Sequence, residues 1–356
     1  MDIQTIEDIQ RLVRQPDTDW TAVGCVYAKY KDNLILLNYT PEAAYGNVWT
    51  PLELMSRGLI LDTQTGEVVA RPFDKFFNVG ENGRMPTTMP DYVTEKVDGS
   101  LGILYRHDGE YHIATRGSFD SEQALWATAF LRAHYDLAGL PDEYTLLFEI
   151  VYPENRIVIN YGERQDLVLL AVRNRFTGEY LPWWETRYLA NTYGFSSPEY
   201  FPADSLNIYL QAAELLDGNK EGFVITCDDG TRWKIKGAEY LKLHKLISAL
   251  SFKNTLRAMQ TNELQAIYDA VPDEFLGDVK TWVADIQHTV TQITEEVQTA
   301  FNDAPKSDRK TFALWVMANH KPLSSYLFAM LDGKPVEPLV YKSLEQDDVM
   351  SLKGEQ

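Results

Sequence analysis

The hydrophobic pattern of this 356-residue chain changes once, at about Lys236. Before this residue, short β-rich runs are bounded by turn-forming residues, which is typical of strands. After it, apolar residues recur at steps of three and four, for example at Val283, Ile286 and Val290, which is typical of amphipathic helices. The change predicts an α+β domain with a mostly antiparallel sheet, followed by a small all-helical domain. We place these domains at residues 1–245 and 246–356.

The individual elements are predicted from the same pattern. A short helix is expected to end near Pro16, and a hairpin is expected to join Thr21–Tyr30 to Leu34–Tyr39 through the turn at 31–33. Further strands are expected at 92–97, 101–105, 111–115, 145–152, 157–161, 167–173, 222–227 and 232–237. Helices are expected at 121–135, 184–192 and 205–216, and in the second domain at 241–259, 263–270, 310–320 and 323–331.

Charge limits the partners that the chain can bind. The sequence has 52 Asp and Glu residues against 33 Lys and Arg residues, a net charge of −19, so no bulk positive field draws it to nucleic acid or to an anionic membrane. A polyanion must therefore be bound by a local patch.

Cys25 and Cys227 lie far apart in apolar stretches and favour buried thiols in a reducing compartment. Since no apolar run is long enough to span a bilayer, we expect a cytoplasmic protein, which we take to be a monomer.

Lys96 lies at the end of an expected strand, one residue before the turn-forming Asp98-Gly99 pair. Taken alone, Lys96 is better explained as a solvated lysine at a hairpin. Farther along the chain, strict alternation places Arg232, Lys234 and Lys236 on one face of a strand. Neighbouring cations repel one another unless an anion covers them. The pattern therefore predicts a polyphosphate site, with a solvated edge strand as the alternative.

Two carboxylates lie in unusually apolar surroundings. Glu149 is flanked by Phe148 and Ile150, and Glu221 opens the run Glu-Gly-Phe-Val-Ile. Burying an unpaired ion costs on the order of several kcal/mol, so each carboxylate is expected to meet a cation, a metal or a ligand hydroxyl. The alternative for each is a strand residue that faces solvent.

These elements occur in the order Lys-x-Asp-Gly (96–99), Phe-Glu (148–149), Glu-Gly-Phe-Val (221–224) and Lys-Ile-Lys (234–236). The ordered set resembles the covalent nucleotidyltransferases, which include the ATP-dependent polynucleotide ligases and the mRNA capping enzymes. Four more segments are similar to those of the bacteriophage RNA ligase 1 family, at 56–62, 71–78, 115–125 and 153–158. The resemblance covers Tyr39 to Lys245 and implies an ATP-grasp-like ligase fold for the first domain.

The resemblance also implies roles for individual residues. Lys96 would be the nucleophile that takes AMP from ATP, and the other catalytic residues would be Glu149, Lys234 and Lys236. Contacts to ATP would come from Tyr39, Arg57, Lys75, Phe77, Lys96, Asp98, Gly99, Arg116, Glu149, Glu221, Lys234 and Lys236. Glu149 and Glu221 would bind the metal, Mg²⁺ or alternatively Mn²⁺, through carboxylate oxygens. Arg116 stands where the family commonly has lysine, and it keeps the charge but presents a planar fork.

Attack on the α-phosphorus of ATP requires a neutral lysine amine. At an ordinary pKa near 10.4, only roughly one lysine in 2,500 is neutral at pH 7, so the site has to lower the pKa of Lys96. We expect Lys234 and Lys236 to do so by like-charge repulsion, and then to neutralise charge on the transferred phosphate.

The expected activity is that of an ATP-dependent RNA ligase. Lys96 is adenylylated, AMP passes to an RNA 5′-phosphate, and an RNA 3′-hydroxyl then expels AMP. DNA ligases and capping enzymes follow the Lys-x-Lys strand with a β-barrel OB domain, whereas this chain is predicted to be helical from Leu241. In the resembled family the helical domain is linked to recognition of broken tRNA, which makes nicked tRNA in a host cytoplasm the expected substrate. The alternatives are a non-catalytic RNA-binding relative, a DNA ligase or an RNA capping enzyme.

Overall fold

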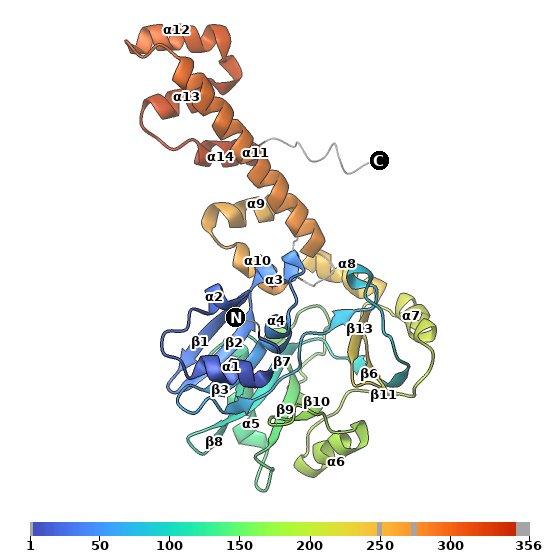
Figure 1. Ribbon diagram of the computed structural model, residues 1–356. Helices are drawn as coiled ribbons and strands as arrows, with labels where there is room; N and C mark the ends of the chain where they lie inside the picture. Colours follow the sequence, from blue (N-terminus) through green and yellow to red (C-terminus); the bar gives the residue numbers. More distant parts are fainter. Residues whose placement is uncertain (1–2, 248–250, 272–275, 347–356) are drawn as a thin grey trace. The chain divides into compact units, whose positions relative to one another are not determined.

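The computed structural model describes residues 3–247, 251–271 and 276–346 (Figure 1). Contacts within the chain group into two compact units, Met1–Ile247 and Ser248–Gln356, and each is described by itself. The first unit combines helices with largely antiparallel sheets, and the described residues of the second form helices without strands. The predicted α+β class and the predicted change to a helical region are therefore confirmed. No helix among the described residues has the length and apolar character needed to cross a membrane.

The first sheet of the first unit is antiparallel, in the order β1-β2-β3-β4. Every residue of β2 is buried, because its two faces pack on different layers. Ile35 and Leu37 pack with the apolar face of helix α1, whereas Leu34 and Leu36 face the second sheet. The elements of this layer are α1 Ile6–Val13, α2 Trp20–Val23, β1 Val26–Lys31, β2 Leu34–Tyr39, α3 Pro41–Gly46, α4 Pro51–Met55, β3 Arg57–Asp62 and β4 Val68–Ala70.

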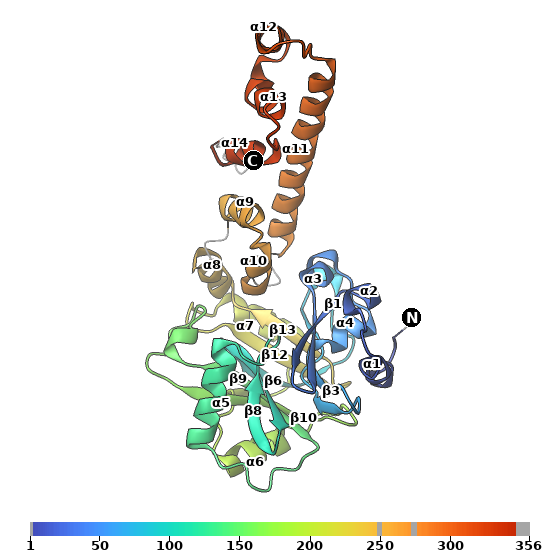
Figure 2. The same cartoon turned by 90° about the vertical axis from the view of Figure 1, so that its left-hand side faces the viewer.

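The second sheet is also antiparallel, in the order β10-β9-β7-β8. Alternation along β9 again places neighbours in different layers: Leu147 packs toward the first sheet and Phe148 packs toward helices α5 and α6. Figure 2 shows α5 lying along this sheet. The elements are β7 Ser100–His107, β8 Glu110–Ala114, α5 Glu122–His134, β9 Tyr144–Val151, β10 Asp166–Asn174 and α6 Trp183–Tyr193.

The third sheet carries the residues singled out by the sequence. Its order is β11-β6-β12-β13-β5, antiparallel except for the pairing of β13 with β5. One face packs on helix α7 through a buried cluster that includes Val93, Phe223 and Ile235. The opposite face carries Lys96. The elements are β5 Phe77–Asn78, β6 Pro90–Lys96, β11 Tyr200–Phe201, α7 Leu206–Glu214, β12 Gly222–Cys227, β13 Arg232–Lys236 and, after the sheet, α8 Ala238–Ile247.

Three predicted elements are wrong in detail. Residues 157–161 form a loop and not a strand; Val158 and Ile159 are apolar because they pack against Tyr240. The first part of the predicted strand at 21–30 belongs to α2, which Asp19 caps by accepting backbone hydrogen bonds. The predicted helix at 241–259 is divided between α8 and the first helix of the second unit.

The second unit is built on one long helix, α11, which α13 and α14 contact (Figure 2). Its core includes Val297, Phe312, Leu327 and Val340, each from a different helix and all fully buried. Val297, Phe312 and Leu327 lie in segments whose apolar spacing predicts helices, whereas the helix that contains Val340 was not predicted. The helices are α9 Phe252–Thr261, α10 Leu264–Ala270, α11 Leu276–Asp303, α12 Arg309–Asn319, α13 Ser324–Leu331 and α14 Glu337–Gln346.

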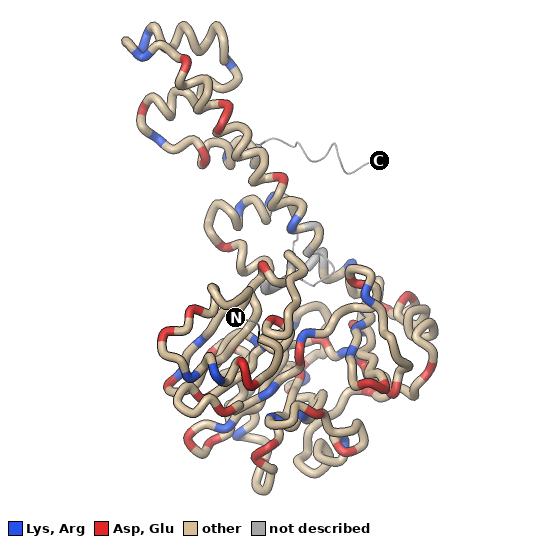
Figure 3. The backbone as a smooth tube through the Cα atoms, viewed as in Figure 1, with Lys and Arg blue, Asp and Glu red and all other residues tan. Residues whose placement is uncertain are grey.

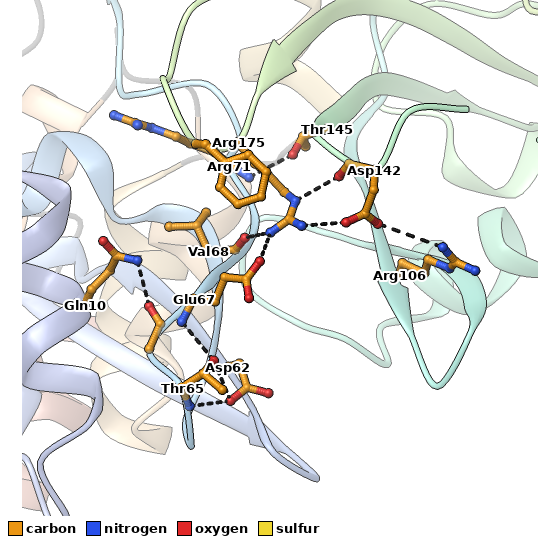
Figure 4. Close-up of polar contacts among 12 residues, drawn as sticks. Gln10, Asp62, Thr65, Glu67, Val68, Arg71, Arg106, Asp142, Thr145 and Arg175 are labelled. Atoms are coloured by element: carbon orange, nitrogen blue, oxygen red, sulfur yellow. Dashed lines mark hydrogen bonds and ion pairs between the residues drawn. The ribbon is translucent and has the colours of Figure 1, made fainter. Parts of the chain in front are cut away.

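A buried arginine joins the first two sheets of the first unit (Figure 4). Arg175 donates from Nη1 to Glu67 Oε1 at 2.8 Å and to the Val68 carbonyl, on the side of the first sheet. It also donates from Nε and Nη2 to the carbonyl and carboxylate of Asp142, at 2.8 and 2.7 Å, just before β9. A planar guanidinium satisfies all four acceptors at once, which lysine cannot do.

We expect Arg175→Ala to lower the free energy of unfolding by about 2–3 kcal/mol, because several hydrogen bonds of a buried charged group are lost together. The matched control is Arg106→Ala. Arg106 approaches the same Asp142 at 3.9 Å from an exposed position, so its loss should cost less than about 0.5 kcal/mol. Urea unfolding of the two variants measures the difference, and equal stabilities would contradict the role given to Arg175.

Candidate active site

The face of the third sheet opposite α7 is organised by strand register. Strand β12 lies between β6 and β13, so each of its outward residues is opposite one residue of each neighbour. Going away from the end of β6, the face consists of the rows Lys96–Gly222–Lys236, Thr94–Val224–Lys234 and Tyr92–Thr226–Arg232. The predicted alternation of cations along β13 is thereby confirmed, with Trp233 and Ile235 on the α7 side.

A cavity of about 220 Å³ lies over these rows. One wall is the sheet face, including Lys96, Lys234 and Arg232. The other wall comes from the start of β3, the segment after β4, and the second sheet, through Arg57, Phe73, Phe76, Leu101, Glu149 and Leu170. Figure 3 shows acidic residues spread along both units, so the cations of this cavity are a local concentration within an acidic chain.

Gly222 lies between Lys96 and Lys236 in the first row and leaves the space between them open. Its φ of +148° is unfavourable for other residues, and a Cβ there would lie 1.9 Å from the carbonyl oxygen of Ile235. No side chain can therefore stand between Lys96 and Lys236. Gly99 makes a second close approach, since its Cβ would lie 2.6 Å from the Ile150 carbonyl oxygen, next to Glu149.

Glu221 holds both lysines of the first row. Its Oε2 accepts a hydrogen bond from Lys96 Nζ at 2.7 Å, and its Oε1 lies 3.5 Å from Lys236 Nζ. The Glu221 side chain is only 3% exposed, so the attraction acts with little screening.

The pKa of Lys96 differs from the sequence-based expectation. Burial alone would lower it, but the attraction of Glu221 and Glu149, together with the hydrogen bond to Glu221, outweighs burial and raises the pKa. The expectation that Lys234 and Lys236 lower this pKa is therefore wrong for the protein without nucleotide. The sequence could not show that a carboxylate from β12 lies directly against the amine.

Glu149 faces the cavity without a partner. Within the part of the chain that the structure describes, its carboxylate makes no hydrogen bond or ion pair. Burial raises the pKa of Glu149 to about 8, and the attraction of Lys96 offsets part of that rise. A half-buried carboxylate in this position fits a hard cation or a ribose hydroxyl.

The two predicted metal ligands are therefore not equivalent. Lysines engage both oxygens of Glu221, whereas no residue that the structure describes engages the oxygens of Glu149. No group of three or more Asp, Glu, His or Cys side chains that could hold a metal occurs among the described residues. A bound Mg²⁺ would have to take its other ligands from substrate phosphates and water, as it commonly does.

Asp98 has a different position from the one predicted. Asp98 is 5% exposed and does not line the cavity. Oδ2 accepts from the backbone N–H groups of Val158 and Ile159 at 2.9 and 2.8 Å, and Oδ1 accepts from the Tyr240 hydroxyl at 2.8 Å. Asp98 thus ties the turn after Lys96 to the 157–161 loop and to α8, which makes it a positioning residue by geometry.

Four other predicted residues meet in a second cluster, which does not line the cavity. Arg116 Nη1 donates to the Tyr39 hydroxyl at 3.0 Å. Lys75 lies over the rings of Phe77 and Trp49, at 5.1 and 5.2 Å. Trp49 and Arg84, which stacks over Phe77 at 4.4 Å, were missed because they lie in no motif and no periodic run. The cluster is an aromatic and cationic surface formed by segments 39–49, 75–84 and residue 116.

Arg57 belongs to the cavity. Its Nη1 is buried without a hydrogen-bond partner in the described structure, and the guanidinium lies 5.9 Å from the Phe76 ring. An unsatisfied buried donor is costly, so this nitrogen is suited to an incoming phosphate or ribose oxygen.

Comparison with known proteins identifies the family. A model described as RNA ligase matches residues 55–246, more than half of the chain. The chain belongs to the RNA ligase family. The matched segment contains every predicted site residue except Tyr39.

Individual relatives agree with this assignment. A protein of Autographa californica nuclear polyhedrosis virus, named for both a polynucleotide kinase and an RNA ligase, is 31% identical over 69% of this chain and 37% of its own length. RNA ligase 1 of bacteriophage TS2126 is 33% identical over 35% of this chain and 35% of its own length. The RNA ligase of Rhodothermus phage RM378 is 25% identical over 86% of this chain and 87% of its own. The chain thus spans little more than a third of the length of several curated relatives.

Solved structures give weaker likenesses. An archaeal ATP-dependent RNA ligase aligns with a TM-score of 0.49 and 15% identity, over 89% of this chain and 90% of that chain. A mutant of Naegleria gruberi RNA ligase with ATP and Mn aligns with a TM-score of 0.37 and 20% identity, over 44% of this chain and 52% of that chain.

We expect Glu221→Gln to lower the pKa of Lys96, because it removes the strongest attraction on the ammonium. More of the amine is then neutral at a given pH, and its acylation by an amine reagent at pH 8, followed by peptide mass spectrometry, should be at least roughly tenfold faster. The matched control is Glu199→Gln, which removes a carboxylate paired with the surface Lys220 and should leave Lys96 unchanged. Equal rates in the Glu221 variant and the wild type would contradict the ion-pair account.

Proposed function

We propose that this chain is an ATP-dependent RNA ligase that works through a lysyl-AMP intermediate. The observation that carries the proposal is the convergence of Lys96, Lys234, Lys236 and Glu149 on one cavity in a member of the RNA ligase family. ATP would supply AMP, with Mg²⁺ or Mn²⁺ as the metal. The ends to be joined would be an RNA 5′-phosphate and an RNA 3′-hydroxyl.

In the first step, the Lys96 nitrogen bonds to the α-phosphorus of ATP, the bond from that phosphorus to the bridging oxygen breaks, and pyrophosphate leaves. The ammonium must first lose a proton. Glu221 is placed to accept it, because Oε2 lies 2.7 Å from Nζ. Lys234 and Lys236 then stabilise the negative charge on the transferred phosphate.

Cofactor contacts follow from the unpartnered groups. We assign Mg²⁺ to Glu149, which lines the cavity, and a phosphate or ribose oxygen to Arg57, whose buried Nη1 supports this assignment. A bound divalent ion would neutralise phosphate charge during the transfer. Gly99 lines the cavity and lets the turn after Lys96 pack closely on β9 beside Glu149, because it has no Cβ to meet the Ile150 carbonyl oxygen.

In the later steps, a 5′-phosphate oxygen takes AMP from Lys96, and a 3′-hydroxyl oxygen then bonds to that 5′-phosphorus and expels AMP. We assign this chemistry to the first unit and RNA recognition, with cleaved tRNA as the candidate, to the helical unit. The enzyme would act as a monomer in the cytoplasm. The helical region after β13, where a DNA ligase or a capping enzyme would carry an OB domain, favours RNA as the substrate.

Intact-mass spectrometry after incubation with ATP and Mg²⁺ should show one added AMP on the wild type and none on Lys96→Ala. The matched control is Lys220→Ala, an exposed lysine paired with Glu199, which should be labelled like the wild type. An unmodified wild type would contradict the proposal and favour a non-catalytic RNA-binding relative.

End-joining assays separate the remaining alternatives. We expect joining of a 5′-phosphorylated single-stranded RNA and of a tRNA cleaved in its anticodon loop, with little sealing of a nicked DNA duplex. Preferred sealing of the DNA nick would overturn the RNA assignment while leaving the lysyl-AMP step intact.

A further inference from the structure

The third row of the sheet face, Tyr92–Thr226–Arg232, has no role in the adenylyl-transfer step described above. It lines the same cavity as Lys96 and lies on the same strands. Arg232 is four residues from Lys236 along β13, which corresponds to about 14 Å of strand. The row therefore lies beyond the lysines that would hold the transferred phosphate, on a continuous surface.

Arg232 is held in place by aromatic rings. Its guanidinium lies 3.7 Å from the centroid of the Tyr180 ring and 5.2 Å from that of Phe73. The guanidinium of Arg173 also lies over the Tyr180 ring, and Arg173 donates a hydrogen bond to Asp74 at 2.9 Å. The Arg232 guanidinium makes no hydrogen bond or ion pair with any residue that the structure describes. A guanidinium fixed by stacking keeps its donors available, and such forks match phosphate geometry.

Three aromatic rings extend from the same row. Tyr92 stacks on Trp183 with ring centroids 5.7 Å apart and planes at 27°, and Trp183 stacks on Tyr200 at 6.2 Å and 12°. Tyr200 lies opposite Thr94 in the register of β11 with β6, so it belongs to the cavity face of the sheet. Its side chain is 44% exposed. The three rings come from β6, α6 and β11 and are nearly parallel, with the outermost member open to solvent.

We propose that this surface binds the RNA strand whose end reacts, with Arg232 holding a backbone phosphate and the Tyr92–Trp183–Tyr200 stack receiving an unpaired base. Arg232 and Tyr92, the first ring of the stack, lie in the same row of the sheet face. One RNA strand can therefore contact both the cation and the rings. Stacking on aromatic rings requires unpaired bases and tolerates any sequence, which fits single-stranded RNA at the end to be joined. The proposal rests on the ligase function and adds the residues that recognise the nucleic acid in the first unit.

The test measures RNA binding without ATP, by fluorescence anisotropy of a labelled, 5′-phosphorylated single-stranded RNA. Arg232→Gln should weaken binding by about tenfold and reduce the slope of log affinity against log salt by about one, as expected for one lost phosphate contact. Tyr200→Ala, at an exposed position where folding is not at risk, should weaken binding by roughly tenfold without changing the salt slope.

Two surface variants on the first sheet serve as matched controls. Lys29→Gln removes an exposed positive charge from β1, and Tyr30→Ala removes a tyrosine that is 61% exposed on the same strand. Both should bind RNA like the wild type. A blunt RNA duplex of equal length, whose end bases are paired, should be bound equally by Tyr200→Ala and the wild type.

The outcome separates this proposal from the ligase function. If Arg232→Gln and Tyr200→Ala both bind the single strand with wild-type affinity and salt slope, the proposal is overturned, whatever happens at Lys96. If both are weakened while the wild type forms no lysyl-AMP, the RNA surface stands and the ligase assignment fails. If Arg232→Gln does not fold, the result for Tyr200→Ala alone decides.

Discussion

The pairing of β12 between β6 and β13 is the constraint on which the rest of the site depends. Register places Lys96, Lys234 and Lys236 in adjacent rows, although 138 and 140 positions separate the last two from the first along the chain. A slip of one residue would send the lysines to the α7 side and bring Trp233 and Ile235 into the cavity. The buried cluster that Val93, Phe223 and Ile235 form with α7 prevents such a slip, so the hydrophobic core of this sheet also fixes the chemistry on its other face.

Glu221 sets the charge state of the neighbouring lysines in the protein without nucleotide. It lies between Lys96 and Lys236, keeps the first protonated and compensates part of the repulsion within the row. A protonated amine is not a nucleophile, so the proposed adenylylation would require that Lys96 lose its proton and that the ion pair reorganise as ATP brings negative charge to the lysines. Asp98 fixes the turn that follows Lys96, because its carboxylate accepts hydrogen bonds from Val158, Ile159 and Tyr240.

Much of this could be predicted from the sequence, and the rest failed for identifiable reasons. Alternation predicted the cationic face of β13, and motif order predicted the fold class; the role of Lys96 as the nucleophile stays a prediction. The pattern could not reveal that Glu221 would face Lys96, because that contact depends on register between distant strands. The sequence pattern wrongly predicted a strand at 157–161, a loop whose apolar residues are buried. It gave no signal for the Tyr92–Trp183–Tyr200 stack, because the three rings come from three separate elements.

The central claim is that Lys96 holds AMP in order to pass it to RNA. Its most direct test is a chase experiment: wild-type protein is labelled with ATP carrying a radioactive α-phosphate, freed of nucleotide, and mixed with 5′-phosphorylated single-stranded RNA and Mg²⁺. The account predicts that the label leaves the protein, appears on the RNA as a 5′-adenylate and is released as AMP when the ends are joined. Label that stays on Lys96, or that leaves only as free AMP without an RNA-adenylate, would contradict it.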